Sequence, residues 1–138
     1  MWSAYDQMGA VFLDHAADSA YNAHYDRPAM LAALGPVAGM QVLDAACGPG
    51  LYSRELLARG AQVTAFDASQ VMVSIAHAET GGQARIGRAV LGEPLPYADS
   101  TFDRIVCALA IHYADDRRAA FAEFYRVLRP SEIGRAHV

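Results

Sequence analysis

The sequence contains no lysine, only two cysteines and no long apolar run. Its eleven basic residues are all arginine, which we attribute to the base composition of the genome. The net charge of −4 argues against a basic surface, so nucleic acid is not an expected partner. No apolar run reaches the length that spans a bilayer, and the first residues lack the segments of a signal peptide. We therefore expect a cytoplasmic protein without a membrane partner.

The cysteines and glycine-rich stretches exclude two further kinds of site. Cys47 and Cys107 are far apart and lie in or beside apolar runs, so neither a disulfide framework nor a zinc site is expected. The Gly-Lys-Ser/Thr sequence of a P-loop is absent. A phosphate-binding P-loop is therefore excluded, and we expect no metal site.

The 138 residues fit one domain, and with 54% hydrophobic residues the chain can bury a core. Residues 1–33 read as helical. Apolar runs then predict strands at 41–45, 62–66, about 84–91 and 104–109, and the segments between them predict helices at 52–59, 70–79 and 117–128. Ser69 and Asp115 are the expected N-caps of the last two helices. Alternating strands and helices indicate an α/β fold with a parallel sheet and right-handed crossovers.

The stretch VLDAACGPGLY, residues 42–52, carries the strongest chemical signal. Asp44 lies near the end of the first strand, 41–45, and a loop of small residues, 46–50, follows that strand directly. In an open α/β sheet, ligands bind beyond the carboxyl ends of the strands. Asp67 ends the second strand, 23 positions after Asp44, where a carboxylate can accept both hydroxyls of a ribose. The ligand is therefore expected to contain an adenosine-like group.

Asp44 helps to distinguish between two possible ligands, a dinucleotide such as NAD and S-adenosylmethionine. A dinucleotide site uses G-x-G-x-x-G, whereas this chain has G-x-G-x-x-S from Gly48 to Ser53. A carboxylate at Asp44 would repel a pyrophosphate but attract a cation. S-adenosylmethionine carries a sulfonium and an ammonium and no phosphate. The residues thus favour S-adenosylmethionine, and an NAD-binding oxidoreductase stays as an alternative.

The chain resembles the class I S-adenosylmethionine-dependent methyltransferases, type 11 subgroup. VLDAACGPG resembles the first motif of that family, with Asp44, Ala46, Gly48 and Gly50 at its four positions. VTAFDAS resembles the segment with the second-strand acid, and LPYADSTFDRIVCALAIHY and YRVLRP resemble later motifs. YNAHYDRPAML is similar to the lead segment of small-molecule methyltransferases. The resemblance covers residues 5–130.

The resemblance implies a set of site residues. The methionine part of the cofactor would be held by Asp44, Ala45, Ala46, Cys47, Gly48 and Gly50. The ribose would be held by Asp67, with Ala68, Met72, Val90 and Leu91 around the adenine and Ala108 facing the methionine amine. Residues 1–33 would form a lid over the cofactor and the acceptor, with Tyr21 and Tyr25 as its candidates. His112 is a candidate base, although methyl transfer needs a base only if the acceptor must lose a proton.

Three departures from the family pattern stand out. Ala46 replaces a glycine, which leaves cofactor binding intact if its φ is negative. Val90 replaces an aspartate that pairs with the adenine amine, which would cost about tenfold in affinity. After Pro130 the family continues with Gly-Gly and more strands, whereas this chain ends in SEIGRAHV. We therefore expect residues 131–138 to be a non-native tail and the fourth strand to form an open edge.

The expected architecture is a Rossmann-like α/β fold, an incomplete class I methyltransferase domain over residues 34–130. Its sheet order is 3-2-1-4, with the later strands missing. The expected function is methyl transfer from S-adenosylmethionine to an O, N or C atom of a small molecule. A truncated, non-catalytic fragment that at most binds S-adenosylmethionine is the other alternative. Nothing in the sequence indicates the oligomeric state or the acceptor.

Overall fold

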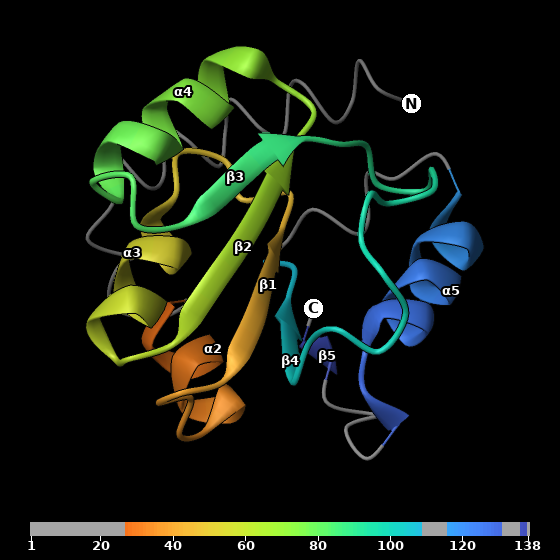
Figure 1. Cartoon of the computed structure of the whole chain (residues 1–138), viewed down its shortest axis with the longest axis horizontal. Helices are drawn as coiled ribbons and strands as arrows, with labels where there is room; N and C mark the ends of the chain where they lie inside the picture. Colours follow the sequence, from red (N-terminus) through yellow and green to blue (C-terminus); the bar gives the residue numbers. More distant parts are fainter. Residues whose placement is uncertain (1–26, 109–115, 131–135, 138) are drawn as a thin grey trace.

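The computed structural model describes residues 27–108, 116–130 and 136–137 (Figure 1). The helices are α2 (Arg27–Leu34), α3 (Leu51–Ala58), α4 (Gln70–Glu79) and α5 (Arg117–Val127). The strands are β1 (Gln41–Ala45), β2 (Gln62–Asp67), β3 (Arg85–Arg88), β4 (Arg104–Val106) and β5 (Ala136–His137). All four strand pairs are parallel, and the order in the sheet is β3-β2-β1-β4-β5. The predicted α/β class and the order 3-2-1-4 are confirmed.

The first half of the domain matches the predicted boundaries most closely. β1 and α4 have the predicted ends, and α3 is shifted by one residue. β3 is shorter than predicted because the chain leaves the sheet after Arg88. Gly92 has φ +92°, and the N–H of Glu93 donates to the carbonyl of Val90 in a turn. A left-handed glycine inside a turn ends the ladder that a longer strand would need.

The far edge of the sheet differs from the prediction. We expected β4 to be an open edge, but β5 pairs with it in parallel, with Ile105 opposite Ala136 and Val106 opposite His137. The two strand residues of β5 lie within the segment 131–138. Pairing supplies partners for backbone groups that an edge strand would otherwise expose. That this segment is non-native stays a prediction.

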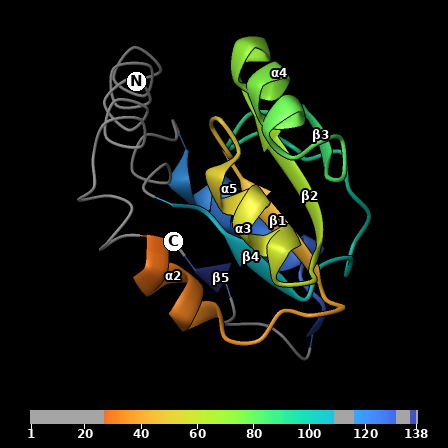
Figure 2. The same ribbon diagram turned by 90° about the vertical axis from the view of Figure 1, so that its left-hand side faces the viewer.

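Two apolar layers cover the sheet, one on each face. Alternate strand residues point to opposite faces, so Val42 packs toward α2 and α3, whereas Leu43 packs toward α5. Figure 1 shows α3 and α5 on opposite sides of β1, and in Figure 2, where the α3 side faces the viewer, α3 lies in front of α5. Phe66, Phe102 and Phe124 are fully buried in the layer under α5. Within the sheet, the parallel pairing of β1 with β2 places their carboxyl ends beside each other.

The helix ends follow local chemistry. The hydroxyl of Ser69 accepts from the N–H of Met72, which confirms Ser69 as the N-cap of α4. The predicted cap of α5 was wrong by one residue, since Asp116 accepts from the N–H of Ala119. Asp115 lies outside the described residues. Adjacent aspartates are equivalent in sequence, and only the backbone decides which one has the extended cap conformation.

Candidate functional site

Asp44 lies at the carboxyl end of β1 and is buried, with 2% of its surface exposed. Its Oδ2 accepts a hydrogen bond of 2.8 Å from the hydroxyl of Ser53, which is in the first turn of α3. Burial raises the pKa of Asp44 to about 7, the Ser53 hydroxyl lowers it, and the neighbouring charge of Asp67 raises it. Among the described residues, no basic side chain pairs with Asp44. A cation beside this carboxyl would therefore stabilise its ionised form.

Asp67 lies at the end of β2 and is also 2% exposed. Its Oδ2 accepts from the N–H of Gly48, and its Oδ1 accepts from the N–H of Ser69, both at 2.9 Å. The carboxylate thus joins the glycine loop to the start of α4.

The loop between β1 and α3 has a left-handed backbone at three of its positions. Ala46 has φ +54°, Gly48 φ +56° and Gly50 φ +88°. We expected Ala46 to leave cofactor binding intact if its φ were negative. That condition is not met. For a residue other than glycine, this left-handed backbone conformation costs roughly 1–2 kcal/mol, because its Cβ lies too close to the following carbonyl oxygen. This chain carries local strain where the family pattern has a glycine.

Gly50 has a packing role at the start of α3. A Cβ added there would lie 2.9 Å from the Cβ of Ala76 and 3.0 Å from its Cα. Contacts this short force the backbone to move, so only glycine lets α3 and α4 approach this closely. This close approach of Gly50 to Ala76 holds the loop 46–50 against α4.

The other predicted cofactor residues lie around the same ends of β1, β2, β3 and β4. Ala45 and Leu91 are core residues, whereas Ala68, Met72, Val90 and Ala108 are partly buried. Cys47 is buried, and its pKa is raised by burial first and then by Asp44 and Asp67. A thiol with a raised pKa stays protonated, so Cys47 is a small apolar contact and not a nucleophile. His112, Tyr21 and Tyr25 lie outside the described residues.

The sequence interpretation gave no role to Ser53. The signal was present, because Ser53 ends the G-x-G-x-x-S pattern and so falls in the first helical turn after the loop. The first turn of α3 brings its hydroxyl to Asp44. Periodicity could not show this, since the bond joins a strand end to a helix across the loop.

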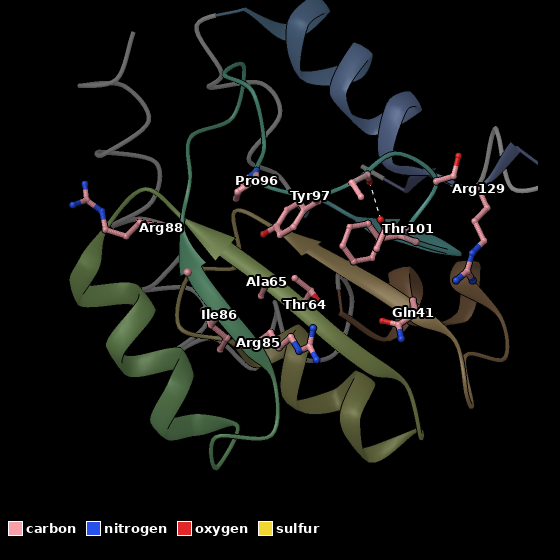
Figure 3. A pocket seen from close by; sticks show the side chains of 14 residues that line it. Gln41, Thr64, Ala65, Arg85, Ile86, Arg88, Pro96, Tyr97, Thr101 and Arg129 are labelled. Atoms are coloured by element: carbon pink, nitrogen blue, oxygen red, sulfur yellow. Dashed lines mark hydrogen bonds between the residues drawn. The ribbon is translucent and has the colours of Figure 1, made fainter.

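A groove of about 770 Å³ lies between strands β2 and β3 and the segment 96–102 (Figure 3). Pro96 and Tyr97 form one side of it, and Thr64 and Arg85 come from the strands. None of the predicted cofactor residues lines this groove. We therefore do not assign it to the cofactor.

Two further observations concern the described part of the chain. No group of three or more His, Cys, Asp or Glu residues with the arrangement of a metal site occurs there. None of its helices combines the length and apolar character that crossing a membrane requires.

Comparison with known proteins agrees with this geometry. The family model described as "Methyltransferase domain" matches residues 43–133. Malonyl-[acyl-carrier protein] O-methyltransferase of Pseudescherichia vulneris is 39% identical over 101 residues, which are 73% of this chain and 39% of that protein. Demethylmenaquinone methyltransferase of Thermobifida fusca is 36% identical over 108 residues, 76% of this chain and 46% of that protein.

A solved structure shows the same fold. The S-adenosylmethionine-dependent methyltransferase of Mesorhizobium loti has a TM-score of 0.68 and 32% identity, over 75% of this chain and 48% of that one. The chain thus spans less than half the length of these three proteins. The matched segment includes Asp44, the glycine loop and Asp67, the residues that the geometry brings together. The chain belongs to the class I S-adenosylmethionine-dependent methyltransferases, in the type 11 methyltransferase-domain family.

Proposed function

We propose that this protein binds S-adenosylmethionine and transfers its methyl group to a small-molecule acceptor. The observation that carries the proposal is the pair of buried carboxylates, Asp44 and Asp67, at the ends of neighbouring strands with the glycine loop between them. Family membership supports the same reading. The cofactor would supply a methyl group already activated by its sulfonium.

The residues fit the charge of this cofactor. Asp44 is buried without a described basic partner and would be stabilised as a carboxylate by the cofactor's cationic methionine end. Asp67 would accept hydrogen bonds from the ribose hydroxyls while keeping its bonds to Gly48 and Ser69. A pyrophosphate, by contrast, would meet two carboxylates. This charge pattern supports S-adenosylmethionine over NAD.

The chain's part in catalysis would be mainly orientation. Methyl transfer is an in-line displacement, and its rate depends on holding the acceptor atom, the methyl carbon and the sulfur in line. The loop at 46–50 is bonded to Asp67 of β2 and packs against Ala76 of α4, so it would hold the methionine end in one position. His112 is proposed as a base only for an acceptor that must lose a proton.

The acceptor itself is not indicated by the relatives. Two of them are named for malonyl-[acyl-carrier protein] and for demethylmenaquinone, which are chemically different acceptors. We propose the segment 1–33, with Tyr21 and Tyr25, as part of the acceptor site. We propose that these residues contribute to the choice of acceptor.

Isothermal calorimetry with S-adenosylhomocysteine tests the cofactor assignment. Saturable binding is expected for the wild type and loss of binding for Asp67→Ala, while NADH should not bind. Asp103→Ala is a matched control, because Asp103 precedes β4 at the opposite end of the sheet. It should leave the affinity unchanged if the protein remains folded by circular dichroism. A folded wild type that does not bind S-adenosylhomocysteine would contradict the proposal.

A further inference from the structure

The segment 89–103, which joins β3 to β4, is the basis of a further inference. It runs for 15 residues without a helix or strand, apart from a single bridge between Phe102 and Leu128. Segments of this length without secondary structure are uncommon in compact domains unless they have a function. Val90 and Leu91 lie at its start, and both are among the residues proposed around the adenine.

Arg126 of α5 contacts this segment through the two terminal nitrogens of its guanidinium group. Its Nη1 donates to the carbonyl of Tyr97 at 2.7 Å and to Asp99 Oδ1 at 2.9 Å, and its Nη2 donates to the carbonyl of Leu95 at 3.0 Å. Its Nε and Nη2 also donate to the two carboxylate oxygens of Glu123, each at 2.9 Å. All five N–H donors of the side chain are thus used.

Glu123 of α5 also contacts the segment, as a hydrogen-bond acceptor. Its Oε1 accepts from the N–H of Leu95 at 2.7 Å, so Leu95 is held through both its N–H and its carbonyl. The hydrogen bond from Arg126 is the main reason that the pKa of Glu123 is lowered. Glu123 is therefore ionised at neutral pH. Arg126 and Glu123 form a bidentate, charge-assisted ion pair.

Apolar packing connects this contact to the start of the segment. Leu91 and Leu95 are buried together with Phe124 and Val127 of α5. At Gly92 the backbone passes so close to α5 that an added Cβ would lie 3.2 Å from the carbonyl oxygen of Asp116. Leu91 and Leu95 thus pack in one cluster against α5, which links the placement of residues 95–99 to that of Leu91 and its neighbour Val90.

The start of the segment is also joined to the ribose-binding strand. The N–H of Ala89 donates to the carbonyl of Asp67 at 3.3 Å. Val90 has no polar side-chain group, so hydrogen bonds from this residue to a purine base can come only from its backbone. Recognition by backbone groups depends on where the chain is held, to within about 0.5 Å.

We propose that Arg126, acting with Glu123, is a positioning residue for the base-binding side of the cofactor site. It acts through Leu95 and Tyr97 on the backbone at Val90 and Leu91. This inference rests on the proposed function, because it concerns the same site. A purely structural role would lower stability and weaken all ligands equally, whereas a positioning role also changes which base is preferred.

The test compares S-adenosylhomocysteine with S-inosylhomocysteine, which has a carbonyl in place of the adenine amine. Calorimetry gives the affinity ratio of the two ligands for the wild type and for Arg126→Lys. Lysine keeps the charge but has three donors and no planar fork. We expect the preference for the adenine ligand to fall about five- to tenfold, the contribution of one hydrogen bond. Arg54→Lys is the matched control, since Arg54 pairs with Glu79 between α3 and α4, away from the segment; its ratio should equal that of the wild type.

The outcomes distinguish failure of the proposed function from failure of the positioning role of Arg126. If the wild type is folded and binds neither ligand, the proposed function fails and this inference fails with it. If the wild type binds but Arg126→Lys loses affinity for both ligands by the same factor, only the positioning role is contradicted. If Arg126→Lys does not fold, Glu123→Gln decides by the same ratio, because it retains an acceptor for the N–H of Leu95.

Discussion

The backbone N–H of Gly48 donates to Asp67 Oδ2 at 2.9 Å, which ties the loop after β1 to the end of β2. The same carboxylate accepts from Ser69 at the start of α4. The residue proposed to bind the ribose thus also holds the loop proposed to bind the methionine part. A cofactor spanning both would meet two groups whose relative position is already set.

The Ala46→Gly variant should be more stable than the wild type. Ala46 has φ +54°, and glycine removes the steric cost of that conformation. Part of the gain is offset because glycine makes the unfolded chain more flexible, so we expect a net increase of about 0.5–1 kcal/mol in the free energy of unfolding. Urea denaturation followed by circular dichroism measures it.

Ala45→Gly is the control for Ala46→Gly. Ala45 is the last residue of β1 and is fully buried, so glycine there should destabilise the protein by roughly 0.5–1 kcal/mol. If Ala46→Gly also destabilises, the left-handed conformation at Ala46 does not occur in solution.

Gly50→Ala should destabilise the protein by at least about 2 kcal/mol, because its Cβ would overlap Ala76 and its φ is +88°. Gly35→Ala is a matched comparison. Gly35 also has positive φ, +74°, but no atom lies within 4 Å of the added Cβ, so about 1 kcal/mol is expected. Thermal unfolding of both variants separates the packing cost from the conformational cost. Equal losses would argue against the close contact of α3 with α4.

Asp44 should make stability depend on pH. A carboxyl has a pKa of about 3.9 in the unfolded chain, and burial raises that of Asp44 to about 7 in the folded protein. The folded state therefore binds the proton more tightly. The stabilising contribution is complete below about pH 4 and is lost as the pH rises to about 7, a change on the order of a few kcal/mol.

The difference between wild type and Asp44→Asn isolates this effect. Urea unfolding at several pH values should show the wild type losing stability relative to the variant between pH 4 and 7. Ser53→Ala should extend this loss to higher pH without changing where it begins, because the Ser53 hydroxyl lowers the pKa of Asp44 in the folded protein only. A constant difference across this range would mean that Asp44 titrates as an exposed carboxyl.

Binding of S-adenosylhomocysteine should strengthen with rising pH for the same reason. The ligand's ammonium favours the ionised form of Asp44, whose fraction rises about tenfold between pH 6 and pH 8 for a pKa of about 7. Calorimetry in two buffers of different ionisation enthalpy should detect proton release near pH 6.5. Proton uptake, or an affinity independent of pH, would be inconsistent with a cation beside Asp44.

The first half of the domain was the most predictable part of the fold. β1 is apolar apart from Gln41 and Asp44, and α4 begins at a serine cap and ends before Gly81, so local chemistry sets their bounds. β3 and β4 were predicted too long, because their ends depend on where neighbouring chain segments turn away. β5 was not predicted at all, since two residues carry no periodicity.

The candidate site divides in the same way. Asp44 and Asp67 could be predicted because parallel strands bring their carboxyl ends to one edge of a sheet, and the acid at each end is visible in the sequence. The bond from Ser53 to Asp44 and the left-handed backbone of Ala46 could not, because each depends on how the loop closes.

The sequence by itself determined the class of fold, through its periodicity, and the two acids of the candidate site, which end apolar runs; the order of the first four strands was implied by the resemblance to the methyltransferase family. The tertiary structure decided which groups those acids bind, how closely α3 approaches α4, and how Arg126 holds the segment before β4. These contacts join residues up to 31 positions apart, as from Arg126 to Leu95. Their energies depend on distance and burial in three dimensions, which a linear pattern does not contain.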